Sequence, residues 1–181
     1  MKILKTKIKG VLLIQPNVYN DERGYFLESF NRKEFYELTR IETSFVQDNQ
    51  SSSIKGVLRG LHFQNPPYAQ AKLVRVIKGS VIDVALDIRK SSPTYGKYVM
   101  KELSDKNHTM MYIPEGMAHG FLTLENDTVF SYKCSNFYDK NSEDSIFWDD
   151  PDLQIKWPVK DPILSIKDQN AKKFTSFVSK F

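Results

Sequence analysis

The feature that most constrains the fold is a series of short alternating runs separated by turn residues. KLVRVI (72–77) leads through Lys78-Gly79-Ser80 into VIDVALDI (81–88). The same pattern recurs in KYVMKEL (97–103), TMMYIP (109–114), HGFLTL (119–124) and TVFSYKC (128–134). Many short strands at this spacing are typical of a sandwich or a barrel, so the sequence predicts an all-β fold.

Local patterns predict a hairpin and two helices. The runs on either side of Lys78-Gly79-Ser80 are expected to pair, with Lys72, Val74 and Val76 on one face and Leu73, Arg75 and Ile77 on the other. Asn31 is a suitable N-cap for RKEFYELTR (32–40), where Phe35 and Leu38 share a face. A second, weaker helix is expected from about Asp168 onward.

Length and composition bound the class of protein. The chain has 181 residues, of which 40% are hydrophobic, and it shows no repeat or linker, so residues 1–181 are predicted to form a single domain. No apolar stretch reaches the length of a membrane span, and lysines interrupt the N-terminal apolar residues, so neither a membrane segment nor a signal peptide is expected. Cys134 is the only cysteine, which favours a reducing, cytoplasmic location.

The charge pattern argues against a nucleic-acid partner. The net charge is +4, but 26 basic residues are interleaved with 22 acidic ones, and the basic runs are no longer than doublets such as Lys172-Lys173. A small anionic ligand held by a few basic groups is the better expectation.

Two segments carry the candidate chemistry. They are VLRGLHFQ (57–64) and IPEGMAHGF (113–121), which together resemble the two signature motifs of the cupin barrel. Metal-binding cupins have a second histidine two residues after the first, whereas this chain has His62 followed by Gln64. An amide is a poor ligand for a transition metal, so no metal and no other cofactor is expected. A histidine that merely fills the barrel interior is the structural alternative for His62 and for His119.

Further polar residues surround the first motif in the sequence. Arg59 and Lys72 flank His62, DERGYFLE (21–28) adds another arginine, and Gln47-Asp48-Asn49 adds amides. Arginine suits a diphosphate, and lysine suits a developing oxyanion. Each of these residues taken alone is more often a solvated surface group.

These motifs belong to an ordered series that resembles the dTDP-4-dehydrorhamnose 3,5-epimerase family across essentially the whole chain. The series consists of DERGYFLESF (21–30), FVQDNQS (45–51), VLRGLHFQ (57–64), residues 70–97, IPEGMAHGF (113–121), YKCSNFY (132–138), DPDLQIKWP (150–158) and LSIKDQNA (164–171). The resemblance implies a cupin-type double-stranded β-helix, or jelly-roll barrel, with a few short helices. It also implies a metal-free homodimer that acts on a nucleotide-diphosphate sugar.

The resemblance assigns roles to individual residues. It implies that His62 is the catalytic base, Asp168 its carboxylate partner, Tyr132 the acid and Lys72 the group beside the substrate's keto oxygen. It further implies a substrate cleft lined by Arg23, Phe26, Glu28, Gln47, Asn49, Arg59, His119 and Tyr138. A base, an acid and a cation suit the removal and return of a proton beside a ketone.

The sequence leaves the substrate and some rival functions open. Residues 138–144 depart from the family pattern, and residues 65–69 resemble its variable loop, so dTDP or GDP, hexose or heptose, and inversion at C3, C5 or both remain alternatives. A ketoisomerase or single-centre epimerase is the nearest enzymatic rival. A non-catalytic sugar-binding cupin is the rival from another class, and a metal-dependent oxygenase is disfavoured by Gln64.

Overall fold

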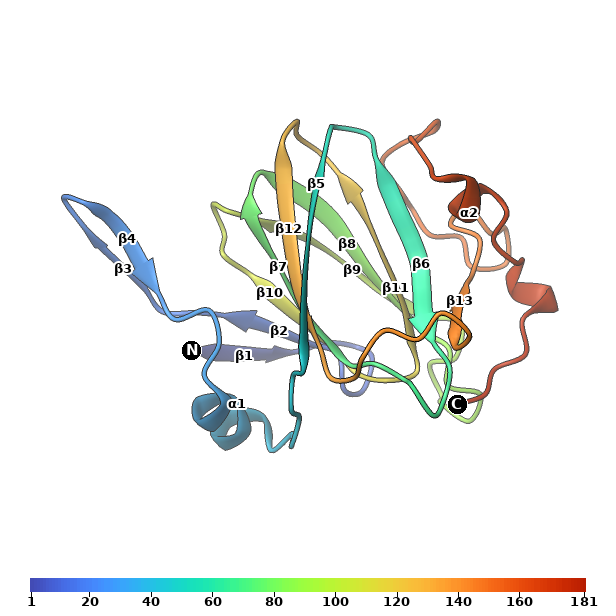
Figure 1. The fold of residues 1–181 in the computed structure, drawn as a ribbon, viewed down its shortest axis with the longest axis horizontal. Coiled ribbons are helices and arrows are strands. Elements are labelled where there is room, and N and C mark those ends of the chain that lie inside the picture. The colour runs from blue at the N-terminus through green and yellow to red at the C-terminus, as the bar shows by residue number, and fades with distance from the viewer.

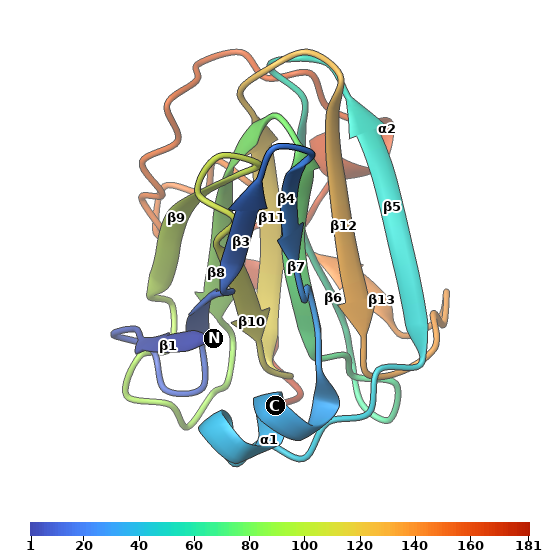
Figure 2. The same ribbon diagram turned by 90° about the vertical axis from the view of Figure 1, so that its left-hand side faces the viewer.

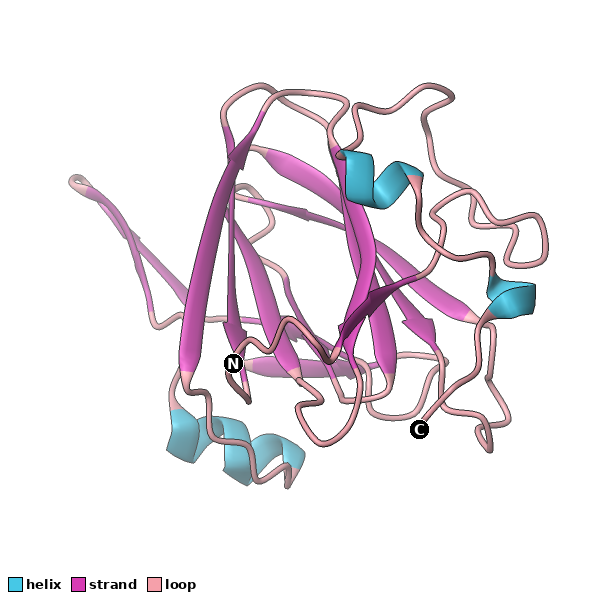
Figure 3. Ribbon diagram, turned by 45° about the vertical axis from the view of Figure 1, so that its right-hand side comes forward, coloured by secondary structure: helices cyan, strands magenta, loops and turns pink.

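A computed structural model describes residues 1–181, and it contains two antiparallel sheets that face each other (Figures 1 and 3). The six-stranded sheet has the order β1 (Lys2–Lys5), β2 (Leu12–Gln15), β10 (Met110–Ile113), β7 (Lys72–Lys78), β12 (Thr128–Cys134) and β5 (Gln47–Ser53). The five-stranded sheet has the order β13 (Glu143–Ser145), β6 (Leu58–Gln64), β11 (Met117–Thr123), β8 (Ser80–Asp87) and β9 (Tyr98–Ser104). The all-β, cupin-type prediction is confirmed.

Successive strands mostly alternate between the two sheets. β7 pairs with β10 and β12, whereas β8 pairs with β11 and β9, so the predicted hairpin between β7 and β8 is wrong. The turn between them carries the chain around a corner of the barrel, where the Gly79 amide donates to the Asp105 carboxylate at 2.8 Å. A short turn between two apolar runs therefore connects two sheets here.

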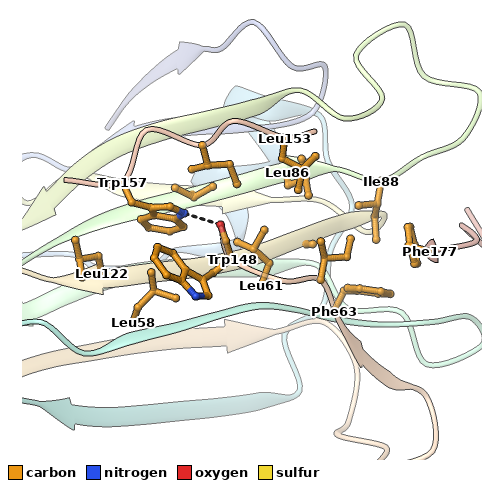
Figure 4. Packing of buried hydrophobic residues seen from close by; sticks show 14 residues of the cluster. Leu58, Leu61, Phe63, Leu86, Ile88, Leu122, Trp148, Leu153, Trp157 and Phe177 are labelled. Atoms are coloured by element: carbon orange, nitrogen blue, oxygen red, sulfur yellow. Dashed lines mark hydrogen bonds between the residues drawn. The ribbon is translucent and has the colours of Figure 1, made fainter. Parts of the chain in front are cut away.

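Two of the three clusters of the buried core frame the site, an inner one and an outer one. Between the sheets pack Val74, Val76, Ala85, Met111 and Phe130, so the predicted alternation of β7 is confirmed for its inward-facing valines. The outer part lies where the C-terminal segment covers the five-stranded sheet (Figure 4). Its labelled members include Leu58, Leu61, Phe63, Trp148 and Trp157, and the Trp157 indole donates to the Trp148 carbonyl at 3.0 Å.

The first predicted helix forms as α1 (Arg32–Thr39). It lies below the six-stranded sheet in the views of Figures 1 and 2. The Asn31 side chain caps it by accepting from the backbone amides of Lys33 at 3.0 Å and Glu34 at 3.2 Å. Phe35 is buried, but Leu38 is exposed, so only one of the two apolar residues contributes to packing.

The second predicted helix is wrong in its extent. The structure has only a short α2 (Ile166–Gln169) and a 3₁₀ turn (Phe174–Ser176). Between these two segments the backbone hydrogen-bonds to another part of the chain instead of forming a helix. The Phe147 amide donates to the Lys172 carbonyl at 2.8 Å. No helix in the structure is long and apolar enough to cross a membrane.

A separate two-stranded hairpin, β3 (Val18–Asp21) and β4 (Gly24–Leu27), projects from the barrel (Figures 1 and 2). Its aromatic side chains are exposed: Tyr19 by 61%, Tyr25 by 55% and Phe26 by 68%. Large aromatic residues that gather on a projecting element indicate an interaction surface.

A β-bulge in β6 decides which of its side chains face the space between the sheets. Arg59 pairs with Phe121 and His62 pairs with His119, so Gly60 and Leu61 together stand opposite Gly120. Strict alternation would turn residues three apart to opposite faces. Because of the extra residue, Arg59 and His62 both line the inner cavity, while Leu58 and Leu61 pack in the outer core.

Gly60→Ala is expected to destabilise the protein, because Gly60 has a φ of +139° and an added Cβ would lie 2.5 Å from Gly120 Cα. Gly24→Ala is the matched control, since Gly24 has a φ of +123° but nothing within 4 Å of the added atom. We expect Gly60→Ala to lower the free energy of unfolding by at least about 2 kcal/mol more than the control, measured by urea denaturation. Equal effects of the two substitutions would contradict the steric argument.

Candidate active site

A cavity between the two sheets has two adjoining compartments of about 440 Å³ and 300 Å³. His62, Lys72 and Tyr132 line both compartments and therefore mark their junction. His62 comes from β6 of the five-stranded sheet, and the other two come from β7 and β12 of the six-stranded sheet. The histidine thus approaches the cavity from the opposite side to the lysine and the tyrosine.

His62 is paired with a buried carboxylate from the C-terminal segment. Its Nε2 lies 2.5 Å from Asp168 Oδ1, and Asp168 is only 2% exposed. Ser165 caps α2 by accepting from the Asp168 amide at 3.1 Å, and its hydroxyl donates to Asp168 Oδ2 at 2.8 Å. Both carboxylate oxygens are therefore engaged, and the imidazole is fixed in orientation.

The Asp168 carboxyl is ionised in this setting. Burial alone would raise its pKa, but hydrogen bonds from His62 and Ser165 and the charge of Lys167 outweigh burial and lower it. An ionised carboxylate accepts a hydrogen bond, so His62 Nε2 is the donor to Asp168, and Nδ1 is the ring nitrogen that remains for other contacts. The pair has the form of a histidine base with an orienting carboxylate.

Lys72 and Tyr132 lie side by side, with Lys72 Nζ 5.8 Å from the centre of the Tyr132 ring. Burial lowers the pKa of Lys72, although the charges of Cys134, Asp83 and Glu143 oppose this effect. Burial raises the pKa of Tyr132, so its phenol stays protonated across the neutral range. The arrangement supplies a proton donor and a cation on the same side of the cavity.

The larger compartment also contains Arg59 and His119. Arg59 donates through Nε and Nη2 to the Ser53 hydroxyl, each at 3.2 Å. His119 Nε2 lies 3.0 Å from Oδ2 of the fully buried Asp83, and burial lowers the pKa of this histidine. His119 is thus a second histidine–carboxylate pair directly across β6 and β11 from His62.

The smaller compartment brings together three of the six remaining predicted binding residues. Gln47, Asn49 and Tyr138 line it, and Gln47 Nε2 donates to Asn49 Oδ1 at 3.1 Å. β5 presents Gln47 and Asn49 on one face by simple alternation, opposite Cys134 and Tyr132 of β12.

Gln64 does not complete a metal site. Its Nε2 donates to the carbonyls of Tyr68 at 2.6 Å and Phe137 at 3.1 Å, and its Oε1 accepts from the Asp139 amide at 2.8 Å. The side chain is thereby bonded to two loops, and no group of three histidine, cysteine or acidic residues converges anywhere in the structure. These donors do not fit a transition metal.

Three predicted binding residues lie apart from this cavity. Arg23, Phe26 and Glu28 are exposed on or beside the projecting hairpin, and none of them lines either compartment. The Arg23 guanidinium instead pairs with Asp21 of the same hairpin. Within one chain the structure does not bring these residues together with His62.

Several polar residues of the site were missed at the level of sequence. Ser165 could have been found, because Ser-x-x-Asp is a helix-capping pattern. Asp83 had a weaker signal, as an acidic residue inside the apolar run VIDVALDI (81–88), since a buried carboxylate needs a partner. Ser53 had no signal, because a serine in a strand is usually unremarkable.

A jelly-roll barrel with a histidine–carboxylate pair facing a tyrosine and a lysine across a cavity between its sheets defines a cupin-type protein suited to acid–base chemistry. The family model described as dTDP-4-dehydrorhamnose 3,5-epimerase matches residues 5–176. The chain therefore belongs to the dTDP-4-dehydrorhamnose 3,5-epimerase family, as the resemblance of its motifs implied.

Relatives cover nearly the whole chain. The dTDP-4-dehydrorhamnose 3,5-epimerase of Shigella flexneri is 55% identical over 174 residues, which is 96% of each chain. The crystal structure of the Elizabethkingia anophelis enzyme of the same name matches with a TM-score of 0.92 and 52% identity over 97% of each chain. A Legionella pneumophila 3,5-epimerase in complex with dTDP-4-keto-L-rhamnose matches with a TM-score of 0.94 and 47% identity over 98% of this chain and 94% of that one.

Proposed function

We propose that this protein is a 3,5-epimerase that acts on a dTDP-linked 4-keto-6-deoxyhexose and contributes to the synthesis of sugars for surface polysaccharides. The observation that carries the proposal is the His62–Asp168 pair facing Tyr132 and Lys72 across one cavity. The alternative of a non-catalytic sugar-binding protein is disfavoured, because sugar binding does not require a buried carboxylate that is hydrogen-bonded to the histidine through one oxygen and to a serine through the other. We also propose that the protein acts in the cytoplasm.

The relatives favour dTDP and two inverted centres over the alternatives. The Legionella protein is in complex with dTDP-4-keto-L-rhamnose, and a Bacillus anthracis homologue that is 42% identical has TDP bound. A Streptomyces niveus relative named dTDP-4-dehydrorhamnose 3-epimerase is only 37% identical over 171 residues, compared with 55% for the Shigella 3,5-epimerase. We therefore prefer double inversion to single-centre epimerisation, and hexose to heptose.

The proposed reaction begins at the carbons on either side of the ketone. The free Nδ1 of His62 takes the C3 or C5 proton, and Asp168 stabilises the resulting imidazolium. Negative charge then grows on the C4 oxygen, where the Lys72 ammonium offsets it. Tyr132 stands on the opposite sheet from His62, so its phenol can return a proton to the other face of the carbon. Arg59 and His119 are proposed to bind the substrate, with Arg59 toward the diphosphate.

Exchange with solvent deuterium separates the role of the base from that of the acid. His62→Ala should abolish exchange of the C3 and C5 protons with deuterated water. Tyr132→Phe should leave exchange measurable but lower the yield of inverted product by about 100- to 10,000-fold, because delivery from the second face is lost. Exchange and product stereochemistry are followed by NMR, with Tyr36→Phe on α1 as the control. Exchange by His62→Ala at the wild-type rate would remove His62 from the mechanism.

The dependence of activity on alkaline pH tests the role of Lys72. Burial lowers the pKa of Lys72 and raises that of Tyr132, so with rising pH Lys72 loses its proton first, below its ordinary range near 10.5. The activity of the wild type should fall over the pH range in which Lys72 loses its proton. Lys72→Arg should move the fall to higher pH, since arginine stays charged, whereas Lys72→Met should lose about 100-fold or more at every pH. The pH profile of kcat/KM is the measurement, and an unchanged alkaline limb in Lys72→Arg would assign that limb to another group.

We further propose a homodimer in which the hairpin of one copy enters the substrate cleft of the other. This arrangement would bring Arg23, Phe26 and Glu28 to a site that they do not reach in their own chain. Exposed aromatic residues on the hairpin favour such a contact, and Arg23 would add a second guanidinium for the diphosphate.

Mixing inactive variants tests this exchange of hairpins between subunits. Arg23→Ala and His62→Ala, refolded together, should form mixed dimers with one intact site, which gives about one quarter of wild-type activity. A mixture of Tyr132→Phe and His62→Ala should recover nothing, because both residues belong to the same chain's cavity. If the first mixture also stayed inactive while native mass spectrometry confirmed mixed dimers, the hairpin would not serve the partner's site.

A further inference from the structure

The hydroxyl of Ser165 makes two hydrogen bonds to a single residue, Asp168. It accepts from the Asp168 backbone amide at 3.1 Å and donates to Asp168 Oδ2 at 2.8 Å. The first bond caps α2, whereas the second reaches a carboxylate that is only 2% exposed and that pairs with His62 through its other oxygen. The first bond is all that an N-cap requires, so the second has a separate consequence.

The backbone on both sides of Ser165 is fixed. Before it, the Leu58 amide donates to the Ile163 carbonyl at 3.0 Å, and the Ile163 amide donates to the Gly56 carbonyl at 2.8 Å. After it, the Gln169 amide donates to the Ser165 carbonyl at 3.0 Å. Ser165 is exposed at the edge of the larger compartment, so its hydroxyl is directed by this backbone and not by packing.

The bond from Ser165 shares the negative charge of Asp168. Burial would raise the pKa of Asp168, but the hydrogen bond and charge of His62, the hydrogen bond from Ser165 and the charge of Lys167 together lower it. A carboxylate that is stabilised by a second donor has less affinity for a proton. It therefore stabilises the neighbouring imidazolium less strongly than a carboxylate with a single partner would.

Other polar and charged groups face the His62–Asp168 pair without bonding to it. They are Lys167 of α2, Glu143 of β13, Lys72 of β7, His119 of β11, Tyr132 of β12 and Arg59 of β6. Lys167 is engaged with Glu143 at 2.5 Å, and His119 with Asp83 at 3.0 Å. Ser165 is thus the one side chain besides His62 that hydrogen-bonds to the Asp168 carboxylate.

We propose that Ser165 is a positioning residue that keeps His62 in its proton-accepting form by sharing the charge of Asp168. This inference rests on the proposed function, because it adds a residue to the base of that reaction. Without the hydroxyl, Asp168 should hold the imidazolium more tightly, so the base should be lost at a higher pH. A serine that only caps α2 would affect the stability of the protein and leave that pH unchanged.

The acidic limb of the kcat/KM profile, measured with the dTDP-linked 4-keto-6-deoxyhexose, tests the proposal. Ser165→Gly removes the hydroxyl but leaves a residue that is accepted at an N-cap. The limb should move to higher pH by about half a unit, which corresponds to about a threefold tighter hold on the proton. Ser165→Thr keeps the hydroxyl, so its limb should coincide with that of the wild type. Asn31→Gly removes the cap of α1 in the same way and is the matched control, whose limb should not move.

The same effect is measured without turnover by NMR. The chain has three histidines, so the ring signals of His62 are assigned by comparison with His62→Asn. The pH midpoint of this ring should rise by about half a unit in Ser165→Gly. The rise should vanish in an Asp168→Asn background, where no carboxylate charge is left to share. If the wild type does not turn over the sugar nucleotide, the proposed epimerase fails, while the titration still decides the role of Ser165.

Three results would overturn the inference. An acidic limb and a ring titration that both stay in place in Ser165→Gly would leave Ser165 as a helix cap only. Equal shifts in Ser165→Thr and Ser165→Gly would exclude the hydroxyl as the cause. A shift that persists in the Asp168→Asn background would show that Ser165 does not act through the carboxylate. Unfolding midpoints are measured in parallel, and Ser165→Ala carries the comparison if Ser165→Gly does not fold.

Discussion

The arrangement of the site depends on the bulge in β6. This strand has to present apolar residues to the outer core and polar residues to the cavity, and a regular strand would do so at alternate positions. The extra residue at Gly60-Leu61 changes that order, so that Leu58 and Leu61 face the outer core while Arg59 and His62 face inward. The close approach of Gly60 to Gly120 leaves no room for a side chain on either glycine. Backbone geometry, fixed by two glycines, thereby decides where the histidine lies.

The outer core has a second consequence for the site, because it fixes the C-terminal segment that supplies Asp168. Trp148 and Trp157 pack against β6 and its neighbours, and burial of such large side chains contributes about 2 kcal/mol or more each. The segment then returns along the edge of the barrel, where Val57 bridges to Ile163. Ser165 starts α2 at that point, and Asp168 reaches His62 across a sequence separation of 106 residues. Apolar burial on one face of the sheet therefore stabilises a polar pair on the other.

The sequence was most informative where a periodic pattern and the local chemistry agreed. The strands, the Asn31 cap and the inward face of β7 could be predicted, because each depends on neighbouring residues. Strand partners could not, since Lys78-Gly79-Ser80 has the composition of a hairpin turn but crosses between sheets. Family resemblance named His62, Lys72, Tyr132 and Asp168, and the structure brings these four together. It also named Arg23, Phe26 and Glu28, which lie on or beside the projecting hairpin and do not line the cavity of their own chain.

The charges inside the barrel explain how Lys72 is accommodated in the cavity before a substrate binds. An isolated ammonium in an apolar interior is costly and tends to lose its proton. Lys72 has the buried Asp83 carboxylate and the Glu143 carboxylate near enough to oppose that loss, while Asp83 is itself bonded to His119. The two carboxylates that face Lys72 have other hydrogen-bond partners, so neither forms a direct ion pair with it in the structure. The proposed role of Lys72, to offset the charge on an oxygen that becomes negative, requires that it has no such direct partner. A cation that is stabilised by nearby charges, without a direct ion pair, suits a group that is proposed to interact mainly with the transition state.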